Sequence, residues 1–386
     1  MKVLHLHAGT LFGGVETVLT TFARERACCP EMEPSYGVCF EFRLSEELRA
    51  AGVPVTNLGA ARISRPWTVW QARQAFARHL REARPDAVLC HMAKPLYLFG
   101  SVAKKQGVPV VYYIHNPVDP DATDVFDKLI RRIPKPDLVI GVSEHTAQSV
   151  RDDLYPDVPA VAVYNPLPFP AERFAITAEE RAALRRELDT PDDAVVIIQA
   201  TRLDGWKGHH DLLRALGAMR ETPGWVHWLV GGAQREPDHA YLQSLKDLAV
   251  EQGIADRVRF AGLRSDVPRC MAASDVYCQA NTSPEGLGMS FIEAMTAGIP
   301  VVTTDLGPAR EVVGDDGGIL TPPNDPAALA EVLSALVTNP ERRAGLGRTA
   351  RARVDRQFSA CGQVRKLHDV LQEQGVARNG RTPGNP

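Results

Sequence analysis

Two adjoining stretches decide the fold: Asp275-Val276-Tyr277-Cys278-Gln279-Ala280, then Ser283-Pro284-Glu285-Gly286-Leu287-Gly288-Met289-Ser290-Phe291-Ile292-Glu293-Ala294-Met295. The first is typical of a buried strand, because β-branched and aromatic side chains dominate it. The second predicts a glycine-rich loop and a helix over residues 289–297, which Gly298 and Pro300 end. Ligands of open α/β sheets bind at such a loop, since it follows the carboxyl end of a strand.

The glycines of this loop indicate an anionic ligand. Gly286 and Gly288 allow the backbone to approach a bound group closely. The amides of Leu287, Gly288, Met289 and Ser290 can then face that group at the positive end of the helix dipole. We therefore expect these residues to bind a phosphate-like group.

Two carboxylates lie eight positions apart, Glu285 in the loop and Glu293 inside the helix. Glu285 would repel a phosphate, so we assign it to the hydroxyls of an attached sugar and Glu293 to those of a ribose. A carboxylate suits both roles because it offers only acceptors. The alternative is a Ser290–Glu293 capping box with Glu285 as a surface residue, and the local pattern leaves both interpretations open.

Length and composition are those of a two-domain globular protein. The chain has 386 residues, too many for one ordinary core, with 44% hydrophobic and 24% charged residues. A net charge of -3 argues against a dedicated nucleic-acid binder. No apolar run approaches the ~18 residues that span a bilayer, and residues 1–7 lack a signal-peptide layout. We expect a cytoplasmic protein.

The cysteines suggest no covalent framework. No Cys-x-x-Cys pair is present, and an odd number scattered through strands and helices predicts reduced core thiols without disulfides or a zinc site. The seven are Cys28, Cys29, Cys39, Cys90, Cys270, Cys278 and Cys361.

Strand-like and helix-like runs alternate along the whole chain. Continuous Val, Ile and Leu runs separated by helical patterns, such as residues 17–26 and 68–83, predict parallel sheets covered on both faces. The fold class is therefore α/β, with two Rossmann-like doubly wound domains. The strands are expected near residues 2–7, 35–40, 54–59, 87–92, 109–115, 138–143 and 160–165, then near 194–200, 227–232, 258–262, 276–281, 300–305 and 317–321.

The domains are expected to join at residues 165–170, where three prolines exclude a helix and a central strand. The N-terminal domain would then cover residues 1–167 and the C-terminal domain residues 168–358. Residues 359–374 have a helical pattern. The Gly-, Pro- and Asn-rich residues 375–386 are predicted to fray.

Gly13 and Gly14 open the first helix after the first strand and predict a second anion cradle. Their spacing is not that of a dinucleotide fingerprint or of a P-loop. A tight turn that serves only the fold is the alternative.

Arg202 and Lys207 follow the first strand of the second half, at the same sheet edge as the Glu285 loop. Arginine can grip phosphate oxygens in a bidentate fork, and lysine adds a point charge. With a helix dipole, the two cations could offset the charge of a diphosphate without a metal ion. Solvated loop cations are the alternative.

His115 ends the strand over residues 109–115, so its imidazole has access to the ligand-binding edge of the first sheet. A structural histidine is the alternative. The next loop contains Asp119 and Asp121, an Asp-x-Asp pair that we interpret as a turn and not as a metal site.

Residues 62–84 form a basic amphipathic segment. Six arginines against one glutamate surround an apolar helical face of Val69, Ala72, Phe76 and Leu80. This pattern could touch an anionic membrane surface, or it could be a solvated helix over the core.

Together, these motifs resemble the retaining glycosyltransferases of the GT-B fold, specifically family four with its Glu-x7-Glu motif. The resemblance covers nearly the whole chain, and its strength comes from the order and spacing of the motifs. Thr201 and Ser290 depart from the commonest pattern without removing a functional group. The matching stretches are Gly13-Gly14-Val15-Glu16, Arg202 with Lys207-Gly208, Glu285-Gly286 with Glu293-Ala294, and Ala297-Gly298-Ile299-Pro300-Val301-Val302.

The resemblance implies two domains facing a cleft, with the donor bound by the second. Glu285 would contact the hydroxyls of the donor sugar and Glu293 those of the ribose. Arg202 and Lys207 would hold the diphosphate, helped by the loop amides. Arg264 would begin the nucleobase pocket.

The resemblance also assigns roles to the first domain. Its Gly13-Gly14 loop would assist in binding the diphosphate, and His115 would lie near the donor sugar. The last helix would pack back onto this domain. No bound metal or other cofactor is implied.

The predicted reaction is transfer of a sugar from a nucleotide diphosphate sugar to an acceptor hydroxyl, with retention of anomeric configuration. The acceptor, a saccharide, a lipid-linked saccharide or a small molecule, would meet loops at residues 10–12, 91–95 and 117–124. The rivals are a nucleotide-sugar epimerase or sugar phosphorylase and, behind these, a non-catalytic nucleotide-sugar-binding protein. No nucleic-acid partner is expected. Residues 62–84 could make weak contact with the inner face of a membrane.

Overall fold

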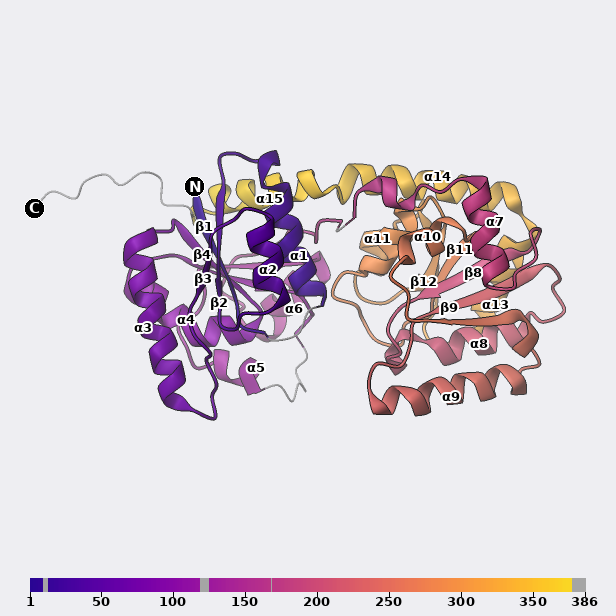
Figure 1. Cartoon of the computed structure of the whole chain (residues 1–386), viewed down its shortest axis with the longest axis horizontal. Helices are drawn as coiled ribbons and strands as arrows, with labels where there is room; N and C mark the ends of the chain where they lie inside the picture. Colours follow the sequence, from indigo (N-terminus) through magenta and orange to yellow (C-terminus); the bar gives the residue numbers. More distant parts are fainter. Residues whose placement is uncertain (10–12, 119–124, 168, 377–386) are drawn as a thin grey trace, which may run out of the picture. The chain divides into compact units, whose positions relative to one another are not determined.

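The computed structural model describes residues 1–9, 13–118, 125–167 and 169–376. The chain divides into two compact units, one containing Met1–Pro168 and the segment from Ser359 onward, the other Phe169–Phe358. Each unit has its own fully parallel sheet with helices around it (Figure 1). The predicted α/β class with two doubly wound domains is confirmed.

The first unit has seven strands in the order β3-β2-β1-β4-β5-β6-β7. Each predicted strand of this half is present. Strand β4 pairs with β1 on one side and with β5 on the other, so the carboxyl ends of these three strands are neighbours. The strands are β1 (Lys2–His7), β2 (Glu33–Val38), β3 (Val55–Asn57), β4 (Ala87–His91), β5 (Val110–Ile114), β6 (Leu138–Gly141) and β7 (Ala160–Ala162).

Helices cover both faces of this sheet because its strands are apolar on both sides. Phe76 of α3 and Phe99 of α4 pack with ring centroids 4.8 Å apart in the core of one face. Leu19 of α1 and Leu44 of α2 pack on the other face. Each such fully buried side chain contributes about 1.5–3 kcal/mol. The helices are α1 (Gly14–Arg24), α2 (Arg43–Ala50), α3 (Pro66–Ala83), α4 (Ala93–Lys105), α5 (Val125–Ile130) and α6 (Glu144–Asp153).

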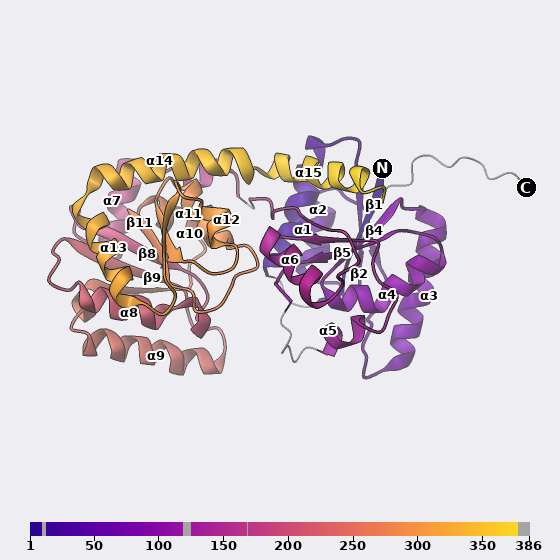
Figure 2. The ribbon, with the colours of Figure 1, turned by 180° about the vertical axis from the view of Figure 1, so that it is seen from behind.

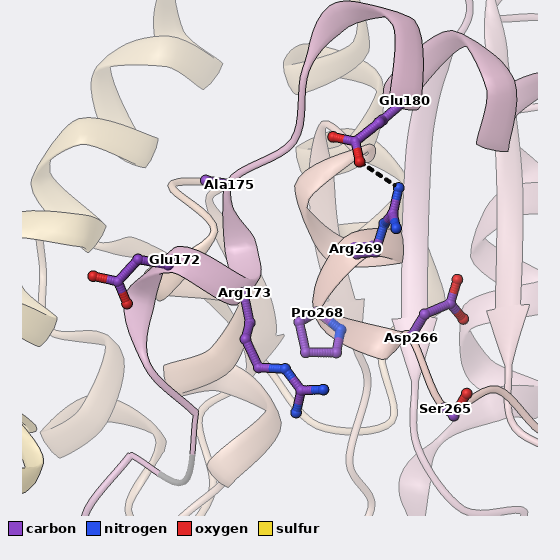
Figure 3. A pocket seen from close by; sticks show the side chains of 8 residues that line it. All are labelled: Glu172, Arg173, Ala175, Glu180, Ser265, Asp266, Pro268 and Arg269. Atoms are coloured by element: carbon purple, nitrogen blue, oxygen red, sulfur yellow. Dashed lines mark hydrogen bonds and ion pairs between the residues drawn. The ribbon is translucent and has the colours of Figure 1, made fainter.

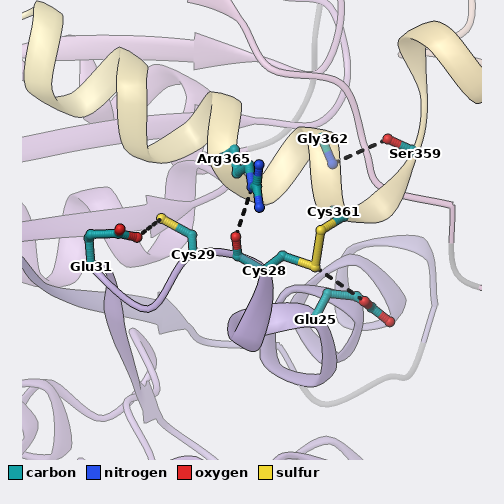
Figure 4. Close-up of a disulfide and its surroundings, with 8 residues drawn as sticks. All are labelled: Glu25, Cys28, Cys29, Glu31, Ser359, Cys361, Gly362 and Arg365. Carbon is teal, nitrogen blue, oxygen red and sulfur yellow. Dashed lines mark hydrogen bonds between the residues drawn. A yellow bond between two sulfur atoms is a disulfide. The ribbon is translucent and has the colours of Figure 1, made fainter.

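Helix α15 (Ala360–Glu373) also belongs to the first unit, where it contacts α1 and the 3-10 helix η1 (Glu25–Cys28) (Figure 2). A disulfide joins Cys28 to Cys361, and Nε of Arg365 donates to the carbonyl of Cys28 at 2.8 Å (Figure 4). The prediction that all cysteines are reduced is wrong for this pair. Packing of α15 on η1 brings together two thiols 333 positions apart. The other five cysteines are free and buried.

The second unit has six strands in the order β10-β9-β8-β11-β12-β13. Leu212, Leu245 and Leu333, from α8, α9 and α13, fill the core on one face. Helices α10 and α11 lie on the opposite side of the sheet (Figure 1). The strands are β8 (Val195–Ala200), β9 (Trp225–Val230), β10 (Val258–Gly262), β11 (Val276–Gln279), β12 (Val301–Thr304) and β13 (Gly318–Thr321). The helices are α7 (Ala178–Glu187), α8 (His209–Ala218), α9 (Glu236–Glu251), α10 (Val267–Ala272), α11 (Met289–Thr296), α12 (Ala309–Val313), α13 (Pro326–Thr338) and α14 (Pro340–Gln357).

Among the described residues, no helix combines the length and apolarity needed to cross a lipid bilayer.

Candidate active site

Glu285 lies in the loop between β11 and α11, at the centre of a hydrogen-bonded cluster. Its Oε1 accepts from Nζ of Lys207 at 2.5 Å, from Nε2 of Gln279 at 2.8 Å and from Nδ2 of Asn281 at 3.3 Å. Among the described residues, no hydrogen bond ends on Oε2. The protein therefore fixes one carboxylate oxygen and leaves the other available as an acceptor.

The backbone places Lys207 at the end of the 3-10 helix η3 (Gly205–Lys207), just after β8. Nε2 of Gln199 donates to the carbonyl of Lys207 at 2.8 Å. The next residue, Gly208, has φ +70°, and a Cβ there would lie 1.5 Å from the carbonyl oxygen of Ala280. Only glycine permits this approach of η3 to the end of β11, which brings Lys207 to Glu285.

Lys207 is a buried cation with an aromatic and an anionic neighbour. It is 8% exposed, and Nζ lies 3.8 Å from the centroid of the Trp206 ring. Burial lowers the pKa of Lys207, while the nearby charge of Glu285 opposes that shift. An ammonium group with so little hydration interacts strongly with an added anion.

Arg202 lies close enough to Lys207 for its charge to contribute to the lowered pKa of that lysine. Its side chain is 69% exposed, and a terminal nitrogen lies 3.0 Å from a carboxylate oxygen of Asp204. The structure therefore brings Arg202, Lys207 and Glu285 into one neighbourhood, with Arg202 on the solvent side.

Glu293 lies in the second turn of α11, and burial raises its pKa to about 7. The capping-box alternative is wrong, because the helix begins after Gly288 and has no side-chain cap. Instead, Oγ of Ser290 donates to Oε1 of Gln279 at 3.3 Å, and the hydroxyl of Tyr277 donates to the same oxygen at 2.7 Å. These bonds hold Gln279 in the orientation that serves Glu285.

Gly288 shapes the loop before α11, the stretch that was predicted to bind an anion. Gly288 adopts φ +94°, and a Cβ there would lie 2.5 Å from the ring of Phe291. The first amides of a helix have no acceptor within it, so those of Met289 and Ser290 point away from the helix body. Leu287 is buried, and Gly286 is partly exposed.

Arg264 has no contact with the Glu285 cluster among the described interactions. Its guanidinium donates in two bonds of 2.8 Å to Asp266 and in one of 2.6 Å to Glu187. These bonds raise the pKa of Arg264 further above its ordinary value. The role of Arg264 at a nucleobase stays a prediction. Its guanidinium N–H groups already donate to the carboxylates of Asp266 and Glu187.

A cavity of about 340 Å³ lies beside the start of α10 (Figure 3). Arg269 and Glu180, which both line this cavity, form an ion pair of 2.9 Å. None of the predicted site residues lines it. The lining residues are Glu172, Arg173, Ala175, Glu180, Ser265, Asp266, Pro268 and Arg269.

In the first unit, His115 belongs to a row of three buried imidazoles. Nδ1 of His5 lies 2.9 Å from Nε2 of His91, and Nδ1 of His91 lies 3.0 Å from Nε2 of His115. Tyr36 stacks on His5, and Tyr113 stacks on both His91 and His115. The adjacency of β1, β4 and β5 produces this row.

Gly13 and Gly14 start α1 in the same unit. The amide of Gly13 donates to Oε2 of Glu16 at 2.8 Å, and Oε1 of Glu16 lies 2.8 Å from Nε2 of His7. The carboxylate of Glu16 therefore already accepts a hydrogen bond from one amide of the predicted anion-binding loop. Residues 10–12 of this loop, and Asp119 and Asp121, lie outside the described residues.

Across the described ranges, no three His, Cys, Asp or Glu side chains are arranged as metal ligands.

Comparison with known proteins agrees with this architecture. The family model of group 1 glycosyl transferases matches residues 180–353, and that of glycosyltransferase family 4 matches residues 12–168. The chain belongs to this glycosyltransferase family. The resemblance inferred from the motifs is confirmed.

Two bacterial mannosyltransferases are similar to this glycosyltransferase. A GDP-mannose-dependent monoacylated alpha-(1-6)-phosphatidylinositol monomannoside mannosyltransferase of Corynebacterium glutamicum is 27% identical over 312 residues, covering 78% of this chain and 80% of that protein. A GDP-mannose-dependent alpha-(1-6)-phosphatidylinositol monomannoside mannosyltransferase of Mycolicibacterium smegmatis is 30% identical over 268 residues, covering 66% and 68%.

Solved structures show the same fold. The crystal structure of Anabaena Alr3699/HepE in complex with UDP has a TM-score of 0.81 and 24% identity, covering 97% of this chain and all of that one. The glycosyltransferase thus has the GT-B fold.

Sequence reasoning missed the residues that support the predicted site of this glycosyltransferase. Gln279 and Asn281 follow the apolar part of β11. Polar side chains at the end of a buried strand need hydrogen-bond partners, so these two residues could have been predicted to belong to the site. In the first unit, the signal was a histidine at or near the ends of three strands. The residues to which the sequence had assigned no individual role are His5, His7, Glu16, His91, Tyr277, Gln279 and Asn281.

Proposed function

We propose that this glycosyltransferase moves a sugar from a nucleoside diphosphate donor to an acceptor hydroxyl, with retention of anomeric configuration and without a bound metal ion. The Glu285 cluster carries the proposal, because it sets an open carboxylate oxygen beside the buried cation Lys207. Sugar hydroxyls need acceptors, and a leaving diphosphate needs positive charge. The relatives that are named GDP-mannose-dependent, and the UDP bound in the Anabaena structure, support a nucleotide-sugar donor.

In this proposal, Oε2 of Glu285 accepts from hydroxyls of the donor sugar, and Glu293 accepts from those of the ribose. Lys207 and Arg202 bind the diphosphate, together with the amides of the loop before α11. The roles that the resemblance implies for Gly13, Gly14 and His115 toward the donor stay predictions.

The chemistry is electrostatic. As the bond between the anomeric carbon and the diphosphate oxygen breaks, negative charge grows on the diphosphate, and Lys207 and Arg202 stabilise it. The acceptor hydroxyl attacks from the face that the diphosphate leaves, and its proton passes to the departing phosphate oxygen. No carboxylate of the enzyme becomes bonded to the sugar, so Glu285 serves to bind and orient the donor.

A panel of nucleotide sugars tests this function. One donor should raise the melting temperature in proportion to its saturation of the protein, and its nucleoside diphosphate should be released only when an acceptor is present, with or without EDTA. Loss of release in EDTA would contradict metal independence. Conversion of the donor without an acceptor would instead indicate an epimerase, and binding without turnover by any acceptor a non-catalytic protein.

We also propose that α3 brings the enzyme to an anionic membrane surface. Trp67 and Trp70, 61% and 63% exposed, lie on the outward face of this helix, and Ile63 just before it is 40% exposed. Spacings of three and four residues continue that face to Arg78 and Arg81. Interfacial helices combine exposed aromatic residues with basic residues in this way.

Within the part of the chain that the structure describes, most of the arginines of this segment have no acidic partner. Among the described residues, no ion pair involves Arg62, Arg65, Arg78, Arg81 or Arg84. A basic side chain near an anionic bilayer contributes about 1 kcal/mol of binding free energy. The enzyme should co-sediment with phosphatidylglycerol vesicles at low salt and much less with neutral vesicles.

Two variants make that experiment specific. The double change Trp67→Ser and Trp70→Ser should reduce binding, whereas Val250→Ser, an equally exposed apolar residue on α9, should leave it unchanged. Absence of binding to anionic vesicles at low salt would discard the membrane contact without affecting the proposed reaction.

A further inference from the structure

Gln279, the last residue of β11, has a side-chain amide in which every hydrogen-bonding position is used. Its Nε2 donates to Oε1 of Glu285 at 2.8 Å and to Oδ1 of Asn281 at 2.7 Å. Its Oε1 accepts from the hydroxyl of Tyr277 at 2.7 Å and from Oγ of Ser290 at 3.3 Å. A side-chain amide has two N–H donors and two acceptor lone pairs, so this buried amide is saturated.

The neighbours of this amide allow it only one orientation. A carboxylate offers acceptors alone, so Gln279 must turn its nitrogen, and not its oxygen, toward Glu285. The same argument orients Asn281, whose Nδ2 lies 3.3 Å from Oε1 of Glu285. Oε1 of Gln279 is then left facing two hydroxyl groups, both of which must donate. The proton of the Ser290 hydroxyl is therefore directed at Gln279.

The sheet holds Gln279 from its other side. Oγ1 of Thr303, on the neighbouring strand β12, donates to the backbone carbonyl of Gln279 at 2.7 Å. The hydroxyl of Tyr277 has one proton and lies 3.4 Å from the carbonyl of Ala200, so the shorter bond to Gln279 takes that proton. Residues of the second unit alone therefore fix this amide.

The fixed amide restricts what Glu285 offers to a ligand. Gln279 and Asn281 each direct an N–H at its Oε1, and Lys207 adds an ammonium group. These donors hold the carboxylate by one oxygen, and within the described part of the chain no hydrogen bond ends on Oε2. Oε2 can only accept, so the group of a sugar that meets it must be a donor such as a hydroxyl.

We propose that Gln279 is a positioning residue for recognition of the donor sugar, and that Tyr277 and Ser290 act on the sugar through it. Gln279 sets the direction of Oε2 by holding Oε1 of Glu285. Without Gln279 the carboxylate is free to rotate, and the sugar hydroxyl loses a fixed acceptor. The role of Glu285 toward the sugar rests on the proposed function, whereas the saturated amide does not.

Nitrogen-15 NMR of the enzyme without substrate tests the saturated amide. The two Nε2 protons of Gln279, assigned through bonds, should exchange with deuterium far more slowly than those of the exposed Gln243 on α9. Tyr277→Phe and Ser290→Ala should each shift the two signals, since each removes a donor to Oε1. Fast exchange, or signals that neither variant shifts, would overturn the inference even if no Gln279 variant folds.

Calorimetry with GDP, GDP-mannose, UDP and UDP-glucose is the second test. The affinity of a nucleotide sugar divided by that of its own nucleoside diphosphate isolates the contribution of the sugar. Gln279→Met should lower this ratio about tenfold, the effect of one lost hydrogen bond to a charged group, and leave the affinity of the diphosphate unchanged. Gln279→Glu keeps the shape of the side chain without its N–H groups, so it should lower the ratio at least as much.

A double-mutant cycle tests whether Ser290 acts through Gln279. Ser290→Ala should lower the ratio about threefold in the wild type and not at all in Gln279→Met. Gln243→Met is the matched control, because Nε2 of Gln243 also donates to a carboxylate, that of Asp247, at 2.8 Å. It should leave the ratio unchanged.

Two results of these titrations would overturn the inference: an equal effect of Ser290→Ala in both backgrounds, or a wild-type ratio in Gln279→Glu. A protected Gln279 amide in an enzyme that binds no nucleotide sugar would instead refute the proposed function and leave the saturated amide standing.

Discussion

Nζ of Lys207 donates to Oε1 of Glu285 at 2.5 Å, and the two side chains are only 10% and 13% exposed. This pair joins the end of η3 to the loop before α11, the two segments proposed to hold the diphosphate and the sugar. Three donors share one carboxylate oxygen. The ion pair therefore holds the Lys207 ammonium group and the Glu285 carboxylate in position in the absence of a ligand.

Replacing either member should separate binding of the diphosphate from binding of the sugar. Lys207→Met should weaken nucleoside diphosphate binding by about 10-fold to 100-fold, since a charge-assisted hydrogen bond is lost. Glu285→Gln should leave that affinity nearly unchanged. Both should lower kcat/KM by about 10²-fold to 10³-fold. Calorimetry of the nucleotide and initial rates measure these effects.

Lys246→Met is the matched control for this experiment, because it removes an exposed lysine from α9 in the same unit. It should alter neither quantity. Equal loss of nucleotide affinity in Glu285→Gln and Lys207→Met would contradict the separate roles.

Donor affinity should rise with pH through neutrality because of Glu293. Burial raises the pKa of this carboxyl to about 7 in the free enzyme. Ribose hydroxyls donate to the ionised form, so donor binding favours ionisation, and affinity increases as the proton is lost. The dissociation constant should fall between pH 6 and pH 8 and be nearly constant in Glu293→Gln. An unchanged slope in that variant would assign the pH dependence to another group.

Stability should fall as the pH is lowered from about 6.5 toward 3. Burial lowers the pKa of His5, His115 and His209 to about 3 and that of His227 to about 4. The unfolded chain therefore binds more protons in this window, and unfolding becomes easier. Each buried histidine should remove up to about 2 kcal/mol at pH 5. Urea unfolding at pH 7.5 and pH 5 measures the change.

His227→Gln tests one of these contributions. Nδ1 of His227 lies 2.9 Å from the carbonyl of Ile197, to which the glutamine amide can also donate. Loss of stability on acidification should be smaller in this variant than in the wild type. Exposed His239→Gln should behave as the wild type. A wild-type stability that is independent of pH in this window would contradict the buried neutral histidines.

The disulfide between Cys28 and Cys361 should stabilise the first unit. Closing a loop of this length restricts the unfolded chain, and removal of such a bond typically costs about 2–5 kcal/mol. Dithiothreitol should therefore lower the unfolding midpoint of the wild type but not that of the double variant Cys28→Ser and Cys361→Ser. Titration of the denatured, unreduced protein should find five thiols, the number of free cysteines. Seven thiols would show that the bond is absent.

The sequence predicted what local pattern determines. Continuous apolar runs located all the strands, and the position of Lys207 and Glu285 after β8 and β11 placed them at one sheet edge. Direct contact between them was not predictable, since it depends on the close approach of Gly208 to Ala280. A spacing pattern cannot show which backbones touch.

The histidine row and the disulfide could not be predicted from local patterns. The first depends on the order of strands within the sheet, and the second on the packing of the C-terminal helix α15 against the first unit. The histidine row exists because β4 lies between β1 and β5, which the order of the strands along the chain does not reveal. Likewise, Cys28 meets Cys361 only because α15 packs on η1. The odd number and scattered positions of the cysteines had predicted a reduced thiol at both positions.

The stereochemistry of the transfer product tests the central claim most directly. With the donor found in the binding panel and an accepted alcohol, proton NMR of the first product measures the coupling constant at the anomeric carbon. We predict the same anomeric configuration as in the donor, with one nucleoside diphosphate released per linkage formed. A product of inverted configuration would contradict the mechanism proposed for Lys207 and Glu285.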